Sequence, residues 1–135
     1  MSPSPDTQPS LGTRVVHRRY VAHSHAHYAG NLVDGAYGLA LFGDVATEMC
    51  ILTDGDEGLF AAYSEVEFRA PLRAGDVVEI SAELVRVGTR SRDLVFELTV
   101  VARSCGSDDQ PGKAELLDPA LVATTARGTV VVPPR

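Results

Sequence analysis

Two carboxylic acids, Asp44 and Glu48, stand four residues apart in this 135-residue chain, within a stretch that is helical by length and composition. On a helix this spacing places both on one face, where like charges repel by roughly 0.2–0.5 kcal/mol even in solvent. Such a pair in a partly buried groove is suited to general acid–base catalysis, with one group as base and the other as acid. In the simpler interpretation both side chains face water at the edge of the helix.

The segment that leads into this helix, residues 27–35 (HYAGNLVDG), predicts a site for negative charge. Gly30 and Gly35 permit a tight turn, and the first turn of any helix has N–H groups without intrahelical partners. Those groups, reinforced by the helix dipole, could hold the oxygen of a thioester that becomes an enolate. Asn31 or Asp34 also fits an ordinary N-cap, and the two interpretations are compatible.

Three histidines, His23, His25 and His27, alternate just before the helix. On an extended segment they would share one side, an arrangement that can bind a metal ion. No obvious further Cys or His ligand accompanies them, so we predict no metal site. We expect His27, which lies beside the helix start, to be the histidine with a chemical role.

A basic cluster surrounds the short link between two predicted strands. The run RVGTRSR contains Arg86, Arg90 and Arg92, together with Thr89 and Ser91. One interpretation is a soluble hairpin tip. The other is a clamp for phosphate groups, because the guanidinium group binds phosphate in bidentate fashion.

Hydrophobic periodicity identifies the elements that would position these groups. A β-like run covers residues 14–21, and a helix covers about residues 34–52. Alternating apolar residues then predict four more strands, near residues 58–69, 76–87, 91–103 and 121–132. One strand, one helix and four strands indicate an α+β fold in which the helix lies across an antiparallel sheet.

The predicted helix is apolar on nearly all sides. One stripe, which should pack on the sheet, consists of Leu39, Phe42, Ala46, Met49 and Cys50. The opposite face carries Tyr37, Leu41, Asp44, Glu48 and Ile51. Because one sheet covers only one side of a helix, we expect this second face to meet another subunit or a ligand, and we predict a homodimer.

The rest of the chain predicts a single domain at residues 14–135, after a flexible leader at residues 1–13 that is rich in Pro and Ser. A polar loop is expected at about residues 103–119, with a short helical turn at residues 114–117. The excess of 18 acidic over 12 basic residues argues against nucleic-acid and anionic-membrane partners. No secretory signal is recognisable, so we expect a cytoplasmic protein with two reduced cysteines, Cys50 and Cys105.

A set of short motifs is spread over residues 14–132. They are His27-Tyr28, Gly30-Asn31-Leu32-Val33, Gly35-Ala36, Gly43-Asp44-Val45-Ala46-Thr47-Glu48, Asp54-Gly55-Asp56, Leu59-Phe60, Glu67-Phe68, Ala70-Pro71 and Ala74-Gly75-Asp76, with a weaker Ala126-Arg127-Gly128-Thr129. Together these motifs resemble the hotdog-fold acyl-CoA ammonia lyases, the family of beta-alanyl-CoA:ammonia lyase and 3-aminobutyryl-CoA ammonia lyase. The Ala-Pro-x-x-x-Gly-Asp turn is shared by many hotdog thioesterases and marks only the wider fold.

The resemblance implies a five-stranded antiparallel sheet wrapped around one long central helix, in a homodimer or a trimer of dimers with active sites between subunits. It implies reversible loss of ammonia from a 3-aminoacyl-CoA to give a 2-enoyl-CoA, with no cofactor beyond the CoA of the substrate. The alternatives are an acyl-CoA thioesterase, an enzyme that adds an amine to an enoyl thioester, and a non-catalytic acyl-CoA-binding protein. The second carboxylate favours the lyase, because hydrolysis requires only one.

On this interpretation Glu48 is the base at the α-carbon and Asp44 holds the departing amine, although the two roles could be reversed. His27 or Tyr63 assists with the ammonium group, and N–H groups near Asp34 and Gly35 bind the thioester oxygen. The other expected substrate contacts are Asn31 and Tyr37, and the expected CoA contacts are Thr89, Arg90, Ser91 and Arg92.

Overall fold

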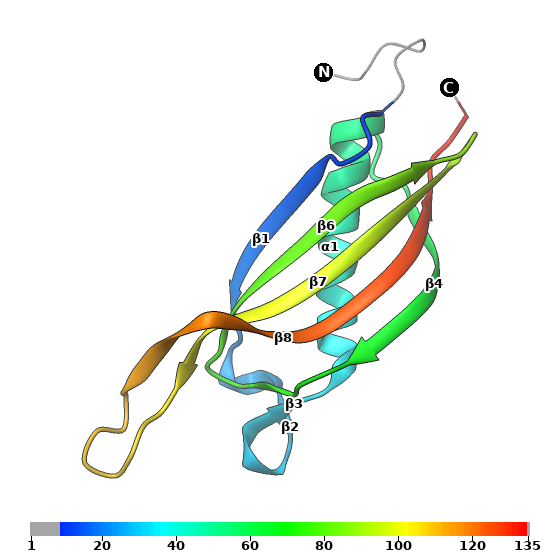
Figure 1. The fold of residues 1–135 in the computed structure, drawn as a ribbon. Coiled ribbons are helices and arrows are strands. Elements are labelled where there is room, and N and C mark those ends of the chain that lie inside the picture. The colour runs from blue at the N-terminus through cyan, green and yellow to red at the C-terminus, as the bar shows by residue number, and fades with distance from the viewer. Residues whose placement is uncertain (1–8, 135) are drawn as a thin grey trace.

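The computed structural model describes residues 9–134, in which one long helix lies against a curved antiparallel sheet (Figure 1). The helix is α1 (Gly35–Asp54). The sheet has the order β1-β6-β7-β8-β4 and consists of β1 (Arg14–Tyr20), β4 (Leu59–Phe68), β6 (Val77–Val87), β7 (Ser91–Ser104) and β8 (Ala114–Val131). This arrangement confirms the predicted α+β fold with a five-stranded sheet and one long helix.

A small second sheet lies beside the start of the helix. It has the order β2-β3-β5 and consists of β2 (Ala26–Tyr28), β3 (Leu32–Val33) and β5 (Leu72–Arg73). Two single turns of 3-10 helix, η1 (His23–His25) and η2 (Ala29–Asn31), connect these strands to the preceding chain and to each other. This sheet was not predicted, because strands of two or three residues are too short to show a period.

The core is built by alternating residues of the two central strands. Those with no exposed area are Val78, Ile80, Ala82 and Leu84 of β6 and Leu94, Phe96, Leu98 and Val100 of β7. Phe42 of α1 stacks on Phe96 with ring centroids 5.0 Å apart. Full burial of one such side chain stabilises the folded state by about 1.5–3 kcal/mol, so this row of contacts holds the helix on the sheet.

The helix buries more of its surface than the predicted stripe. Phe42, Ala46, Met49 and Cys50 are buried as expected, and Leu39 is partly buried. Leu41, which the sequence placed on the opposite face, is only 7% exposed and belongs to the core, because α1 also contacts the edge strand β1. The assignment of Leu41 to the second face was therefore wrong, whereas Asp44, Glu48 and Ile51 are exposed there.

Both ends of α1 have the caps that its flanking residues favour. Asp34 is the N-cap residue, and its Oδ1 accepts a hydrogen bond from the Tyr37 N–H at 3.1 Å. Gly55 follows the helix with φ of 67° and donates its N–H to the Ile51 carbonyl at 3.0 Å. The helix thus occupies nearly the predicted range, residues 34–52.

Strands β7 and β8 continue beyond the sheet as a two-stranded arm (Figure 1). Ala102 pairs with Leu116 and Ser104 with Ala114, so the connecting loop is residues 105–113 rather than 103–119. The helical turn predicted at residues 114–117 is wrong, since these residues are strand. Leu116 is 83% exposed, and an arm that is open to solvent on both faces lacks the apolar alternation by which strands are recognised.

Helix α1 is long and apolar enough, by length and composition alone, to cross a membrane. In this fold it is instead the core helix, since the side of it that faces the sheet is buried there.

The predicted leader lies mostly outside the described residues. Just before β1, the Gly12 N–H donates to the Leu84 carbonyl at 2.8 Å and the Leu84 N–H donates to the Thr13 carbonyl at 2.9 Å. Residues 12 and 13 therefore lie beside strand β6.

Candidate active site

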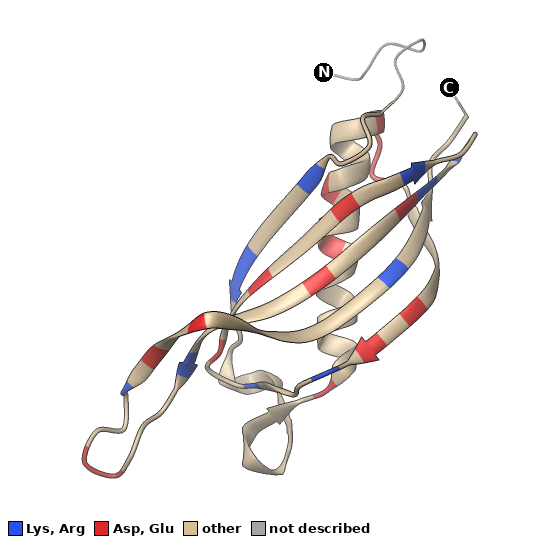
Figure 2. Cartoon of the chain, in the orientation of Figure 1, with Lys and Arg blue, Asp and Glu red and all other residues tan. Residues whose placement is uncertain are grey.

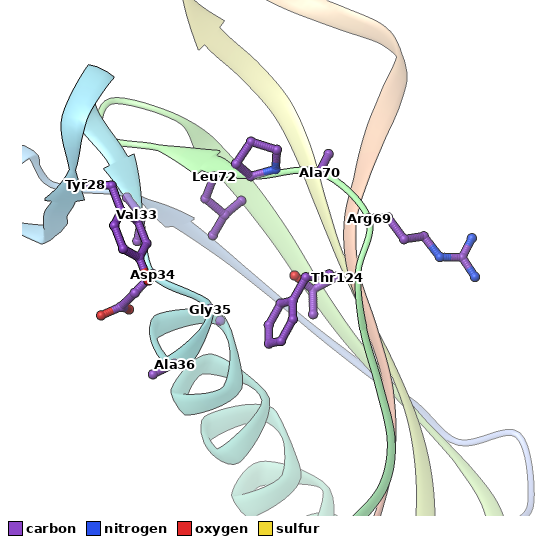
Figure 3. Close-up of a pocket in the computed structure, with 12 residues that line it drawn as sticks. Tyr28, Val33, Asp34, Gly35, Ala36, Arg69, Ala70, Leu72 and Thr124 are labelled. Carbon is purple, nitrogen blue, oxygen red and sulfur yellow. The ribbon is translucent and has the colours of Figure 1, made fainter.

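A cavity of about 610 Å³ opens at the N-terminal end of α1. Its lining comes from the helix start, from the turn after β4 and from β8, and includes Gly35, Ala36, Phe68, Leu72 and Thr124. Figure 3 shows Tyr28 and Val33 on one side of the cavity and Thr124 across from them, whereas Arg69 points away. The cavity is of the size that binds a small organic group.

The first helical turn supplies hydrogen-bond donors to this cavity. The Tyr37 N–H donates to the Asp34 side chain. Among the described residues, the N–H groups of Gly35 and Ala36 have no hydrogen-bond acceptor from the protein. A Cβ at Gly35 would collide with the Phe68 ring, so the site requires glycine for the close approach of helix and strand. These two N–H groups, at the positive end of the helix dipole, fit the predicted site for a thioester oxygen.

His27 lies beside the helix start, as the sequence predicted, but at the surface. Its side chain is 59% exposed, and its Nδ1 is 3.8 Å from the Asp34 Oδ2. The Tyr28 ring packs edge-on against it with centroids 4.6 Å apart. Asp44 lies ten residues beyond Asp34 along α1, a rise of about 15 Å. Within one chain, therefore, the structure does not bring His27 to the carboxylate pair.

Glu48, one of the two carboxylates, is held by residues of β1 that were not predicted to belong to the site. His17 of β1 is hydrogen-bonded through Nε2 to Oε1 of Glu48 at 2.9 Å, and an Arg19 Nη2 lies 3.4 Å from the His17 Nδ1. Figure 2 shows basic bands on β1 and acidic bands on α1. The structure thus adds His17 and Arg19 to the candidate site.

A signal for these two residues is present in the sequence. The alternate positions Val15, His17, Arg19 and Val21 share one face of the strand, and Val15 and Val21 are buried against the helix. Two polar residues between two buried valines on the inward face of an edge strand indicate a polar partner on the helix. That partner is Glu48.

Tyr37 joins the same surface of the helix. Burial raises the pKa of Tyr37, and the nearby Asp44 carboxylate adds to this effect while Arg19 opposes it. The His25 ring packs on Tyr37 with centroids 4.3 Å apart. The hydroxyl group of Tyr37 therefore stays protonated near neutral pH and can donate a hydrogen bond beside Asp44.

Tyr63 lies on the other side of the helix. Its hydroxyl donates to the Leu39 carbonyl at 2.9 Å, and burial raises its pKa. It stands on β4, and the residue that holds Glu48 stands on β1, the opposite edge of the sheet. One chain therefore does not bring Tyr63 to the carboxylate pair.

Asn31 supports the backbone rather than the cavity. It has a positive φ of 61°, and its carbonyl accepts the Ala74 N–H at 2.9 Å. It lines a smaller cavity of about 170 Å³, together with His23 and Arg103. Asn31 is thus not the N-cap of α1, which is Asp34, and it lies outside the lining of the larger cavity.

One residue of the predicted phosphate clamp, Arg92, is buried in the structure. Arg92 is 3% exposed and forms a bidentate pair with Asp54, with Nη2 at 2.7 Å from Oδ1 and Nε at 3.1 Å from Oδ2. Its Nη1 donates to the carbonyls of Gly88 and Ser91, both at 2.9 Å. The assignment of Arg92 to CoA binding was therefore wrong, because its guanidinium group is used inside the protein. Thr89 and Arg90 are exposed and Ser91 is half-buried, so these three residues can reach a ligand.

The three alternating histidines build no metal site in this fold. Across residues 9–134, no group of three or more His, Cys, Asp or Glu side chains lies close enough together to hold a metal ion. His25 and His27 instead pack against the tyrosines Tyr37 and Tyr28.

Comparison with known proteins gives a consistent result. The family model described as "Thioesterase superfamily" matches residues 30–107. The chain is 48% identical over 117 residues to the 3-aminobutyryl-CoA ammonia lyase of Acetoanaerobium sticklandii, which covers 85% of this chain and 90% of that relative. The solved structure of beta-alanyl-CoA:ammonia lyase from Clostridium propionicum superposes with a TM-score of 0.86 at 35% identity, over 91% of this chain and 87% of that one.

A more distant neighbour shares the fold alone. It is a hexameric hotdog-fold thioesterase of Campylobacter jejuni, with a TM-score of 0.70 and 20% identity over 96% of this chain and 85% of that one. The residues matched by the family model, 30–107, include all of α1.

Proposed function

Because this chain belongs to the thioesterase superfamily and, within it, to the hotdog-fold acyl-CoA ammonia lyases, we propose that it eliminates ammonia reversibly from a 3-aminoacyl-CoA to give a 2-enoyl-CoA. The observation that carries this proposal is the pair of exposed carboxylates one turn apart on α1, of which Glu48 is hydrogen-bonded by His17. Elimination requires one group that removes a proton and one that holds an ammonium group. Hydrolysis of a thioester requires only the first.

The proposed reaction proceeds by proton removal at the α-carbon, which the thioester acidifies. The N–H groups of Gly35 and Ala36 donate hydrogen bonds to the thioester oxygen as negative charge develops on it, and one such donor is worth on the order of 3 kcal/mol in the transition state. The Glu48 carboxylate takes the α-proton, the carbon–nitrogen bond breaks, and its electron pair leaves with the nitrogen. The proton on Glu48 then passes to the ammonia, which departs from Asp44 as ammonium.

This mechanism needs two chains, because Gly35 and Glu48 are thirteen residues apart on one straight helix, a rise of about 20 Å. We propose a homodimer in which two antiparallel copies of α1 lie side by side. A two-fold axis at the level of Leu41 and Phe42, midway between Gly35 and Glu48, then places the cavity of one subunit against the carboxylate pair of its partner.

The free edge of the sheet supports such a dimer. Strand β4 is a ten-residue edge strand, and most of its residues are exposed. Leu59 is 73% exposed and Phe68 59% exposed at its two ends. A long edge with exposed apolar residues is a template for pairing with a second copy. The hexameric thioesterase of the same fold is consistent with further assembly into a trimer of dimers.

The CoA moiety is the remaining part of the proposed substrate. Arg90, with Thr89 and Ser91 beside it, offers exposed donors for phosphate groups at the tip of the β6–β7 hairpin. The proposed reaction needs no cofactor beyond CoA, because the thioester itself provides the acidity at the α-carbon.

The proposal is tested with crotonyl-CoA or acryloyl-CoA, with and without ammonium, by recording the enoyl-thioester absorbance and free thiol in parallel. We expect loss of the enoyl band that depends on ammonium and releases no thiol. Release of thiol without ammonium would instead assign the protein to the acyl-CoA thioesterases. It would leave Glu48 as a structural acid.

A further inference from the structure

The contact between His17 and Glu48 assigns a role to a residue outside the cavity. His17 lies in the middle of β1 opposite Ile80 of β6, and its side chain is 16% exposed. Glu48, by contrast, is 51% exposed on the helix. A ring fixed in the sheet therefore holds a carboxylate that would otherwise move freely among its rotamers.

The proton on the His17 ring can be placed from its two partners. A guanidinium group can only donate hydrogen bonds, so the Nδ1 that faces the Arg19 Nη2 at 3.4 Å must be the unprotonated nitrogen. The proton then resides on Nε2, which donates to Oε1 of Glu48 at 2.9 Å. Arg19 thus selects one tautomer, and the ring is neutral in this arrangement.

A neutral donor suits a general base better than a cation would. The hydrogen bond orients Glu48 without placing a positive charge against it, and a positive partner would weaken the carboxylate as a base. Only Oε1 takes part in this bond, so Oε2 is the oxygen available for a substrate proton. The neighbouring Arg18 pairs instead with Glu79, its Nη2 lying 2.7 Å from Oε2 of that residue.

We propose that His17 is a positioning residue for the base Glu48, in the Nε2–H tautomer that Arg19 selects. This proposal rests on the proposed lyase function, in which Glu48 removes the α-proton.

The kinetic test compares two variants of His17 in the ammonium-dependent assay. His17→Leu removes the donor, and we expect kcat to fall about 10- to 100-fold, while KM for the acyl-CoA changes little. In His17→Gln an amide N–H can take the place of the ring Nε2–H, so we expect kcat within about threefold of the wild type. Arg18→Gln, on the same strand, is the matched control and should leave kcat unchanged.

Two kinetic outcomes would overturn the proposal. In the first, His17→Leu turns over at the wild-type rate. In the second, His17→Gln and His17→Leu lose activity equally and unfold at the same reduced urea concentration, which identifies a purely structural residue.

The tautomer is tested without turnover, by nitrogen-15 NMR of the histidine ring in the unliganded protein. We expect the chemical shifts of a neutral ring protonated at Nε2, and we expect Arg19→Gln to change them. A ring protonated at Nδ1, or an imidazolium, would contradict the proposal. If the wild-type protein shows no lyase activity at all, the proposed function fails, whereas the NMR result still decides the tautomer.

Discussion

The two carboxylates of α1 differ in their surroundings although one helical turn separates them. Glu48 is hydrogen-bonded to a ring that is itself held in a sheet, whereas Asp44 is exposed and lies near the Tyr37 hydroxyl. A base must be held at a fixed distance from a carbon-bound proton, since misplacement by 1 Å can cost on the order of 100-fold in rate. The better-held residue, Glu48, therefore fits the role of base, and Asp44 fits the role of ammonium partner.

The first prediction separates these two roles. Glu48→Gln is expected to lower kcat by at least about 100-fold with little change in KM for the acyl-CoA, because an amide cannot accept the α-proton. Asp44→Asn should mainly raise KM for ammonium in the addition direction. The measurement is the rate of enoyl-band loss at varied ammonium concentration. Near-normal turnover of Glu48→Gln would exclude it as the base.

The second prediction concerns the two cysteines, both of which are free. Cys105 is exposed in the arm, whereas burial raises the pKa of Cys50 to about 11. The thiolate is the reactive form of cysteine. Near pH 8 we therefore expect one thiol per chain to react rapidly with an aromatic disulfide reagent, and the second to react only after unfolding. Cys105→Ser should abolish the fast reaction. Two fast thiols in the wild-type protein would show that the helix is not packed as described.

At the scale of the elements, a buried ion pair fastens the β6–β7 hairpin to the end of α1. Arg92 and Asp54 are each 3% exposed and join the hairpin to the last residue of the helix. The pair lies at the far end of α1 from the cavity, so its role is to fix the helix and not to contact the thioester.

The third prediction tests this role of Arg92 against phosphate binding. Arg92→Met leaves the Asp54 carboxylate buried without its cation, which should reduce the free energy of unfolding by about 3–5 kcal/mol in urea denaturation. Arg90→Met, in the same hairpin but exposed, should change stability by less than about 0.5 kcal/mol and raise KM for the acyl-CoA. A stable Arg92→Met variant with a raised KM would reinstate Arg92 in the clamp.

The elements that could be predicted from the sequence are those whose apolar residues recur with the period of a helix or a strand. The apolar alternation of Val78–Leu84 and Leu94–Val100 and the helical stripe around Phe42 determine the five-stranded sheet and its helix. The arm and the small sheet have no such pattern. The same limit applies to the site. Asp44, Glu48 and the helix start are recognisable locally, whereas the partner of Glu48 lies 31 residues away, and that of Arg92 lies 38 residues away.

For the whole molecule, the proposed dimer pairs two copies through the edge strand β4. In two-fold antiparallel pairing of β4 with itself, the residues at its centre face their own copies, and Ser64 lies at that centre and is exposed. The fourth prediction is that Ser64→Asp, which places two carboxylates together, converts the proposed dimer into monomers. Ser107→Asp, in the loop of the arm, is the control with the same charge.

Light scattering after size-exclusion chromatography measures the outcome. The wild-type protein should have at least twice the mass of one chain. A wild-type monomer would contradict the dimer, and an unchanged Ser64→Asp oligomer would contradict pairing through β4.

The last prediction concerns the division of the site between subunits. If the cavity of one chain works with Glu48 of its partner, two inactive variants should restore each other in a mixed dimer. Glu48→Gln lacks the base, and Ala36→Trp fills the cavity at the exposed start of the helix. Random mixing makes half of the dimers mixed, and each mixed dimer has one intact site of two, so co-expression should restore about a quarter of wild-type activity.

Co-expression of Glu48→Gln with Glu48→Ala should restore none. An inactive mixture of well-folded dimers would require both halves of the site to come from one chain. The shared site is expected because the rise of about 20 Å between Gly35 and Glu48 on a straight helix is too long for one small acyl group to span.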